Sequence, residues 1–139
     1  MSEESAYIQL IHDIHTKGED DYSRNGNVKC IFGANMRFSM TNNKIPILTS
    51  KRLAWKTCLK ELLWFISGNT SNKTLKTQNV HIWDGNSSRD FLDSRGLDHL
   101  QEGDLGPIYG FQWRHYNAEY KTCDDDYTNK GVDQLQQII

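Results

Sequence analysis

The clearest structural signal in the sequence is the stretch Leu53-Ala54-Trp55-Lys56-Thr57-Cys58-Leu59-Lys60-Glu61-Leu62-Leu63-Trp64-Phe65-Ile66. Its large apolar residues follow the i, i+4, i+7, i+8, i+11 spacing of one helical face, and they are Trp55, Leu59, Leu62, Leu63 and Ile66. Ser67-Gly68 comes directly afterwards, and glycine commonly ends a helix. The stretch therefore predicts an amphipathic α-helix over residues 53–66.

Four further segments predict helices. Residues 7–17 carry apolar side chains at helical spacing and are followed by Gly18. A short helix is expected after Thr70-Ser71-Asn72, where side-chain oxygens can cap its start, and Ser87-x-x-Asp90 is a capping box for another. Residues 132–139 predict a last helix that stops without a capping residue, which indicates an interrupted helix.

Extended structure is expected where a period of two replaces the helical spacing. Residues 28–32 and 36–40 alternate apolar and polar side chains on either side of Gly33, which predicts two strands joined by a short turn. Residues 80–83 are interpreted as a short extended piece, and Glu19-Asp20-Asp21 as an acidic loop. This mixture of helices and strands predicts an α+β fold.

The composition limits the class of protein. The 139 residues carry 16 basic and 18 acidic side chains, and a net charge of −2 argues against a polybasic nucleic-acid binder. The longest apolar run, residues 62–66, is far shorter than the roughly 20 residues of a membrane span, and the acidic N-terminus is unlike a signal peptide. Cys30, Cys58 and Cys123 are interpreted as free thiols. We expect one soluble, cytoplasmic domain over residues 1–139.

Glu61 is the carboxylate that the helical pattern singles out. Its helical neighbours are mostly apolar, and they are Thr57, Cys58, Trp64 and Phe65. Loss of hydration among such neighbours favours a carboxyl group that can transfer a proton. The alternative is that the side chain reaches solvent or pairs with a lysine, such as Lys60 or Lys51.

Two other places carry the side chains of a small-molecule site. Arg24, followed by Asn25-Gly26, suits an anion such as a phosphate, and Lys51 with the arginine after it offers a second cationic point. Trp83, with Asn86 close by, could stack on a flat heterocycle and hydrogen-bond it, or could simply pack under a loop. No His, Cys and carboxylate set has metal-ligand spacing, so no metal is expected.

Several blocks of the sequence form an ordered pattern. They are Phe32-Gly33, Ile45-Pro46-Ile47-Leu48-Thr49-Ser50-Lys51-Arg52, Glu61-Leu62-Leu63-Trp64-Phe65-Ile66-Ser67-Gly68, Ile82-Trp83-Asp84-Gly85-Asn86, Ser88-Arg89-Asp90-Phe91-Leu92-Asp93-Ser94, Glu102-Gly103-Asp104-Leu105-Gly106-Pro107-Ile108-Tyr109-Gly110-Phe111-Gln112-Trp113-Arg114-His115 and Gly131-Val132-Asp133-Gln134-Leu135-Gln136. The sixth contains a glycine-rich stretch that would fix the backbone around one tyrosine. Read together, these blocks resemble the N-terminal half of thymidylate synthase, from about residue 7 to the last residue. The fifth and the last are similar to the eukaryotic or viral branch.

The resemblance implies the reductive methylation of dUMP to dTMP, with 5,10-methylenetetrahydrofolate as the source of the carbon unit and of a hydride. It also implies a mixed β-sheet with helices packed on one face, and a homodimer formed through the other face. Only the N-terminal portion of such a domain is expected here.

The resemblance assigns roles residue by residue. Glu61 is similar to the carboxylate that acts through ordered water on the pyrimidine carbonyl, and Tyr109 to the tyrosine that supports proton removal from carbon 5. The folate-contacting residues are expected to be Ile82, Trp83 and Asn86, with Lys51 near the glutamate tail. Arg24 is similar to the phosphate-binding arginine, although it stands eight residues before Phe32 rather than nine, and Ala54 replaces an aromatic or histidine that touches folate.

The family's nucleophile is a cysteine in a Pro-Cys-His block. None of the three cysteines has this context, so we expect the chain alone to be inactive. Two alternatives stay open at this point. One is a pyrimidine hydroxymethylase of the same family, and the other is a non-catalytic remnant that binds a partner subunit.

Overall fold

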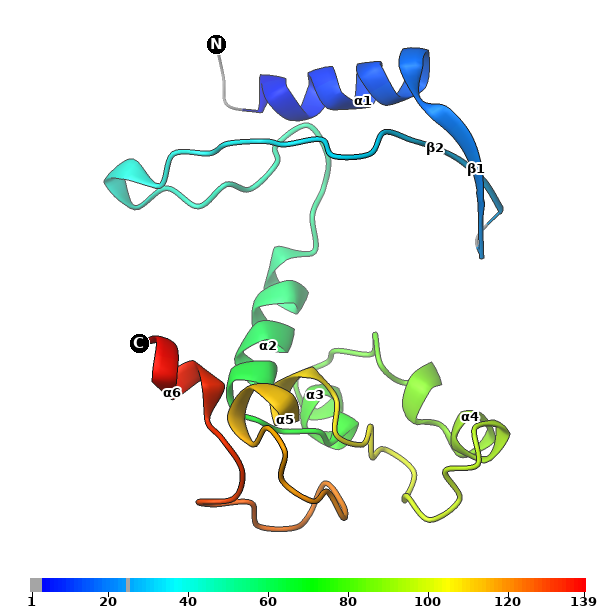
Figure 1. Cartoon of the computed structure of the whole chain (residues 1–139), viewed down its shortest axis with the longest axis vertical. Coiled ribbons are helices and arrows are strands. Elements are labelled where there is room, and N and C mark those ends of the chain that lie inside the picture. Colours follow the sequence, from blue (N-terminus) through cyan, green and yellow to red (C-terminus); the bar gives the residue numbers. More distant parts are fainter. Residues whose placement is uncertain (1–3, 25) are drawn as a thin grey trace. The chain divides into compact units, whose positions relative to one another are not determined.

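The computed structural model describes residues 4–24 and 26–139, and the chain divides into two compact units, Met1–Leu53 and Ala54–Ile139. Each unit has its own set of elements (Figure 1). The described residues form helices and a two-stranded antiparallel sheet. This confirms the α+β expectation at the level of fold class.

The N-terminal unit contains helix α1 (Ser5–Lys17), strands β1 (Glu19–Ser23) and β2 (Gly26–Cys30), and the short 3-10 helix η1 (Thr41–Asn43). The helix expected over 7–17 is confirmed. Its C-terminus is at Gly18, whose N–H donates to Ile14 O at 3.0 Å. The strands then pair from Glu19 opposite Cys30 to Ser23 opposite Gly26.

The strand expectations were only partly right. The segment interpreted as an acidic loop is β1, and residues 36–40, all of them described, form no strand. Pairing explains the first error, because Asp20 lies opposite Lys29 and the two side chains form an ion pair at 3.1 Å. Exposure explains the second, because Met36 and Met40 are 38% and 62% exposed, so the alternation marks no buried face.

Glu4, just before α1, forms hydrogen bonds to Thr49 and Ser50, the two residues before Lys51. Its carboxylate accepts hydrogen bonds from the Thr49 N–H at 2.8 Å, the Thr49 hydroxyl at 2.6 Å and the Ser50 N–H at 2.7 Å. These donors, the Thr49 side chain first, lower the pKa of Glu4 to about 2. Lys51 Nζ lies 5.6 Å from the centroid of the Tyr7 ring in the same unit.

The C-terminal unit is helical. It contains α2 (Trp55–Ile66), α3 (Asn72–Thr77), the 3-10 helix η2 (Gly85–Ser87), α4 (Arg89–Ser94), α5 (Tyr109–Arg114) and α6 (Gln134–Ile138). Its central core is made of Trp64, Leu75 and Val80, which are at most 3% exposed, with Phe65, Trp83, Leu105 and Ile108 packed around them. The helices expected over 53–66, after residue 72 and near the C-terminus are confirmed.

Two local predictions in this unit were wrong. Residues 80–83 form no strand: Val80 and His81 are irregular and residues 82–84 form a turn, with Asp84 N donating to His81 O at 3.2 Å. The residue that caps α4 is Ser88 rather than Ser87, because Ser88 Oγ accepts from Phe91 N. Ser87 is 1% exposed and instead donates its hydroxyl to Trp83 O at 3.0 Å.

Helix α5 lies unusually close to the end of α2. A Cβ atom at Gly110 would lie 2.6 Å from Phe65 O and 2.8 Å from Phe65 Cα. Such distances leave room for no side chain at this position. The close approach sets the place of the first residue of α5, Tyr109.

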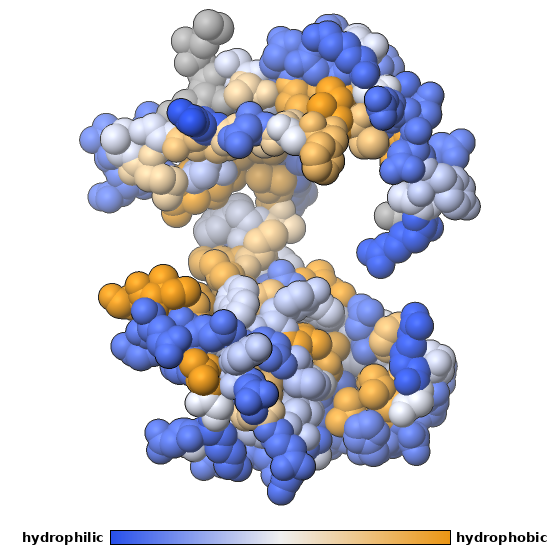
Figure 2. Space-filling model, viewed as in Figure 1, coloured by the Kyte–Doolittle hydropathy of each residue, from blue (hydrophilic) through white to orange (hydrophobic). Residues whose placement is uncertain are grey.

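Apolar side chains also reach the surface of both units (Figure 2). On α2 they are all five residues of the predicted apolar face, Trp55, Leu59, Leu62, Leu63 and Ile66, which are 40–56% exposed. The helix was predicted correctly, but this face does not pack into the core of the unit, which α2 reaches through Trp64 and Phe65. Across residues 4–24 and 26–139, no helix combines the length and the apolarity needed to cross a lipid bilayer.

Candidate functional site

A hydrogen bond between Glu61 and Trp83 lies at the centre of the candidate site. The indole Nε1–H of Trp83, in the turn after Val80, donates to Glu61 Oε1 on α2 at 2.7 Å. Both side chains are half-buried. The lysine alternative for Glu61 is not realised by Lys60, because Lys60 Nζ donates to Gln78 O at 2.6 Å.

Phe65 gathers aromatic rings around this hydrogen bond. Its ring centroid lies 6.3 Å from that of Trp83, 5.3 Å from that of Tyr109 and 5.7 Å from that of Trp113, each in an edge-to-face arrangement. Trp83 and Tyr109 are 6.2 Å apart. The structure therefore brings together three sequence-predicted residues, Glu61, Trp83 and Tyr109, which we call the site cluster.

Sequence reasoning missed Phe65 as part of the site. It stands four residues after Glu61, so helical spacing alone places it on the same side of α2. What the spacing does not give is the set of rings that reach it from other segments.

Asn72, which is 0% exposed, forms hydrogen bonds to two residues of the loop that carries Trp83. Asn72 Nδ2 donates to Asp84 Oδ1 at 2.8 Å and to Ser87 Oγ at 2.9 Å. The first of these hydrogen bonds, together with one from His81, lowers the pKa of Asp84. Asn72 was predicted only as part of a helix cap, so its role under this loop was also missed.

Ile82 and Asn86 lie on either side of Trp83 in this loop. Ile82 is 52% exposed, and Asn86 in η2 is also exposed. Both side chains are therefore accessible to solvent in this loop.

Arg24 and Lys51 belong to the N-terminal unit, whereas the site cluster belongs to the C-terminal unit. Arg24 is exposed at the end of β1, beside Gly26 at the start of β2. The Asn25 part of the anion-site prediction lies outside the described residues. Lys51 is exposed and stands beside Tyr7, as described above.

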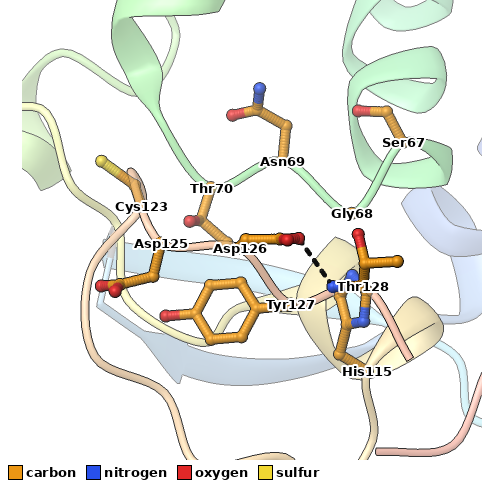
Figure 3. A pocket seen from close by; sticks show the side chains of 10 residues that line it. All are labelled: Ser67, Gly68, Asn69, Thr70, His115, Cys123, Asp125, Asp126, Tyr127 and Thr128. Carbon is orange, nitrogen blue, oxygen red and sulfur yellow. Dashed lines mark hydrogen bonds between the residues drawn. The ribbon is translucent and has the colours of Figure 1, made fainter. Parts of the chain in front are cut away.

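A polar pocket of about 280 Å³ lies elsewhere on the C-terminal unit. Figure 3 shows residues 67–70 along one side of it and residues 125–128 along the other. Its polar side chains are largely engaged within the chain, since Asn69 Oδ1 accepts from Ser71 N at 2.7 Å and Asp126 Oδ1 from Thr128 N at 2.9 Å. It contains none of the sequence-predicted site residues.

The cysteines are free thiols, as expected. Cys30 and Cys58 are exposed, and Cys123 is half-buried at the edge of the pocket. Burial, and secondarily the charge of Asp104, raises the pKa of Cys123, so this thiol is less ionised than an ordinary cysteine. Within the part of the chain that the structure describes, no three His, Cys, Asp or Glu side chains are grouped to hold a metal ion.

The chain is thus an α+β protein in which a half-buried carboxylate lies beside a group of aromatic rings. Such an arrangement can stack on a flat, polar heterocycle and hydrogen-bond it. The family model for thymidylate synthase matches residues 5–139. The chain therefore belongs to the thymidylate synthase family, which confirms the resemblance.

Individual relatives agree with the family match. The chain is 53% identical over 140 residues to the probable thymidylate synthase of Schizosaccharomyces pombe. This alignment covers 99% of the chain and 22% of the relative. It is 50% identical over 138 residues to the thymidylate synthase of Candida albicans, covering 98% and 44%, and 48% identical over 141 residues to that of Agaricus bisporus, covering 100% and 48%. The chain thus spans less than half the length of these curated relatives.

Proposed function

We propose that this chain is the N-terminal part of a thymidylate synthase, which converts dUMP to dTMP with 5,10-methylenetetrahydrofolate. The observation that carries the proposal is the Glu61–Trp83 hydrogen bond beside Tyr109, in a chain of this family. The family match over 5–139 also favours a single synthase domain, to which both compact units contribute.

Glu61 is proposed to transfer protons through water to the pyrimidine. One of its carboxylate oxygens, Oε1, is fixed by Trp83, which orients the other oxygen and keeps it available to a water molecule. The hydrogen bond fixes the position of the carboxylate, as proton transfer through an ordered water requires.

Tyr109 is proposed to support the water that removes the proton from carbon 5. Its ring lies near those of Phe65 and Trp83, and the residue is 57% exposed, so water can reach the side chain. A phenol can both donate and accept a hydrogen bond, as an ordered water network requires.

The folate ring is proposed to meet Trp83, with Ile82 and Asn86 beside it. An indole face, an exposed aliphatic chain and an amide are the contacts that a flat, polar ring system needs. In the N-terminal unit, Arg24 is proposed to bind the nucleotide phosphate and Lys51 the glutamate tail of the folate. Both are exposed cations, as binding of anionic groups requires.

The cysteine that attacks carbon 6 of the pyrimidine is proposed to come from sequence outside these 139 residues. Cys123 has a raised pKa, which disfavours the thiolate, and no cysteine of the chain stands in a Pro-Cys-His block. We therefore expect the 139-residue chain alone to form no dTMP. The full-length protein is proposed to act as a homodimer, which light scattering can test.

The experiment is an assay of the full-length protein with dUMP and 5,10-methylenetetrahydrofolate, with the product identified by mass spectrometry. We expect dTMP, and hydroxymethyl-dUMP would instead identify a hydroxymethylase. Glu61→Gln is expected to lower kcat by about 100-fold or more, the usual size of a general acid–base contribution. Glu119→Gln, which changes an exposed carboxylate outside the cluster, is the matched control and should keep normal activity.

A further inference from the structure

Asp104 is a buried carboxylate that the proposed chemistry does not use. The residue is 0% exposed. Oδ1 accepts hydrogen bonds from the Tyr120 hydroxyl at 2.6 Å and from Gly106 N at 2.8 Å, and Oδ2 accepts from Cys123 N at 2.8 Å. Three donors on one carboxylate offset the cost of removing it from water.

The donors come from two segments that are otherwise separate in the sequence. Gly106 is in the turn just after Asp104, whereas Tyr120 and Cys123 belong to the loop between Tyr116 and Val132. The ends of this loop are joined by a pair of backbone hydrogen bonds at 3.0 and 2.9 Å. Asp104 therefore binds the middle of a closed loop to the turn in front of α5.

Tyr120 extends this connection to the segment after α2. Burial and the nearby Asp104 raise the pKa of Tyr120, so its hydroxyl keeps its proton and donates to Asp104. The Thr70 hydroxyl lies 2.9 Å from the same oxygen and is then the donor of that hydrogen bond. In addition, Leu105 N donates to Thr70 O at 3.1 Å.

The path from Asp104 to Tyr109 is short and constrained. Gly106 has a φ of +71°, a conformation that favours glycine, and Pro107 after it has its own φ fixed by its ring. Ile108 N then donates to Gly106 O at 2.8 Å. Little freedom is left between the buried carboxylate and the first residue of α5.

We propose that Asp104 is a positioning residue for the site cluster: its three hydrogen bonds fix the turn over residues 104–108, which holds Tyr109 against Phe65 and Trp83. The inference rests on the proposed function only in naming this cluster as the site. The connection from Asp104 to Tyr109 consists of hydrogen bonds and backbone within this chain, and it requires no substrate. The test below therefore uses no substrate, and a protein that formed no dTMP would leave its result intact.

The test is Asp104→Asn, a change of similar shape that replaces one acceptor oxygen by a donor facing other donors. NMR measures hydrogen exchange of the Gly106 and Cys123 amides and of the Trp83 indole N–H, with the indole signal assigned through Trp83→Phe. We expect the two amides to exchange about tenfold faster or more, as loss of a charge-assisted hydrogen bond predicts. We also expect the Trp83 indole signal to shift and its exchange to accelerate.

Tyr127→Phe is the matched control. The Tyr127 hydroxyl donates to Thr122 O at 2.8 Å and accepts from Lys121 N at 2.9 Å, so its removal loosens the same loop without touching Asp104. The Trp83 signal should then stay as in the unchanged protein. An equal Trp83 response to both variants, or none to Asp104→Asn, would overturn the proposal.

Tyr120→Phe covers the case in which Asp104→Asn does not fold. This variant removes one of the three hydrogen bonds and leaves the carboxylate in place. We expect a smaller change of the Trp83 signal in the same direction. A folded Tyr120→Phe protein with an unchanged Trp83 signal would refute the coupling.

Discussion

Gly110→Ala tests whether the contact of α5 with α2 is as tight as the distances indicate. The added Cβ would lie 2.6 Å from Phe65 O and 2.8 Å from Phe65 Cα, whereas ordinary van der Waals contact begins at 3.4 Å. Both are backbone atoms of α2, which cannot rotate away as the end of a side chain could. The two helices must therefore separate by several tenths of an ångström.

The magnitude follows from two opposing effects. Alanine in place of glycine inside a helix stabilises it by about 1 kcal/mol. Overpacking of a well-packed contact costs about 1–3 kcal/mol, and backbone atoms place this contact at the upper end. We expect a net loss of about 1–2 kcal/mol in the free energy of unfolding.

Urea unfolding followed by circular dichroism measures this loss, and Gly85→Ala is the matched control. No atom lies within 4 Å of a Cβ at Gly85, so that change should leave the free energy of unfolding within about 0.5 kcal/mol of its starting value. If Gly110→Ala were as stable as Gly85→Ala, the close approach of the two helices would be wrong.

Three further predictions concern single groups. Trp83→Phe keeps a ring but leaves Glu61 Oε1 without its donor, so the free energy of unfolding should fall by about 1–3 kcal/mol in urea titrations, and no change would argue against the hydrogen bond. Because the pKa of Glu4 is lowered from 4.5 to about 2 in the folded protein, its stabilising contribution is complete above pH 4.5 and is lost as the pH falls toward 2. NMR titration of the Glu4 carboxyl carbon measures this pKa, and Thr49→Val, which removes a hydroxyl donor, should raise the pKa of Glu4. Because the pKa of Cys123 is raised, a thiol reagent at pH 8 should modify the two exposed cysteines first, and Cys123→Ser should remove only the slow phase.

Helix α2 was predictable because its signal is local. A dozen residues with apolar side chains at helical spacing, closed by Ser67-Gly68, contain all the information that the helix needs. Strand β1 was not predictable in this way. Its acidic residues are poor strand formers alone, and an opposite-charge pair with β2 compensates for this, which appears only when both strands are considered together.

The candidate site also contains both residues that the sequence identifies and residues whose role depends on contacts between distant segments. Glu61 and Trp83 could be named from the residues themselves and Tyr109 from the resemblance, and the structure brings these three together. Phe65 and Asn72 could not, because each acts through side chains that are distant in the sequence. A helical pattern shows Phe65 as one more apolar position, and Asn72 as one more polar residue at a helix start.

The central place of Phe65 has a consequence for how this protein can change in evolution. One ring contacts four others, those of Trp64, Trp83, Tyr109 and Trp113, which come from α2 itself, from the loop after Val80 and from α5. A new side chain at position 65 would alter all four contacts at once, so a compensating change at any single partner could not repair them. We therefore expect these five positions to change together or not at all.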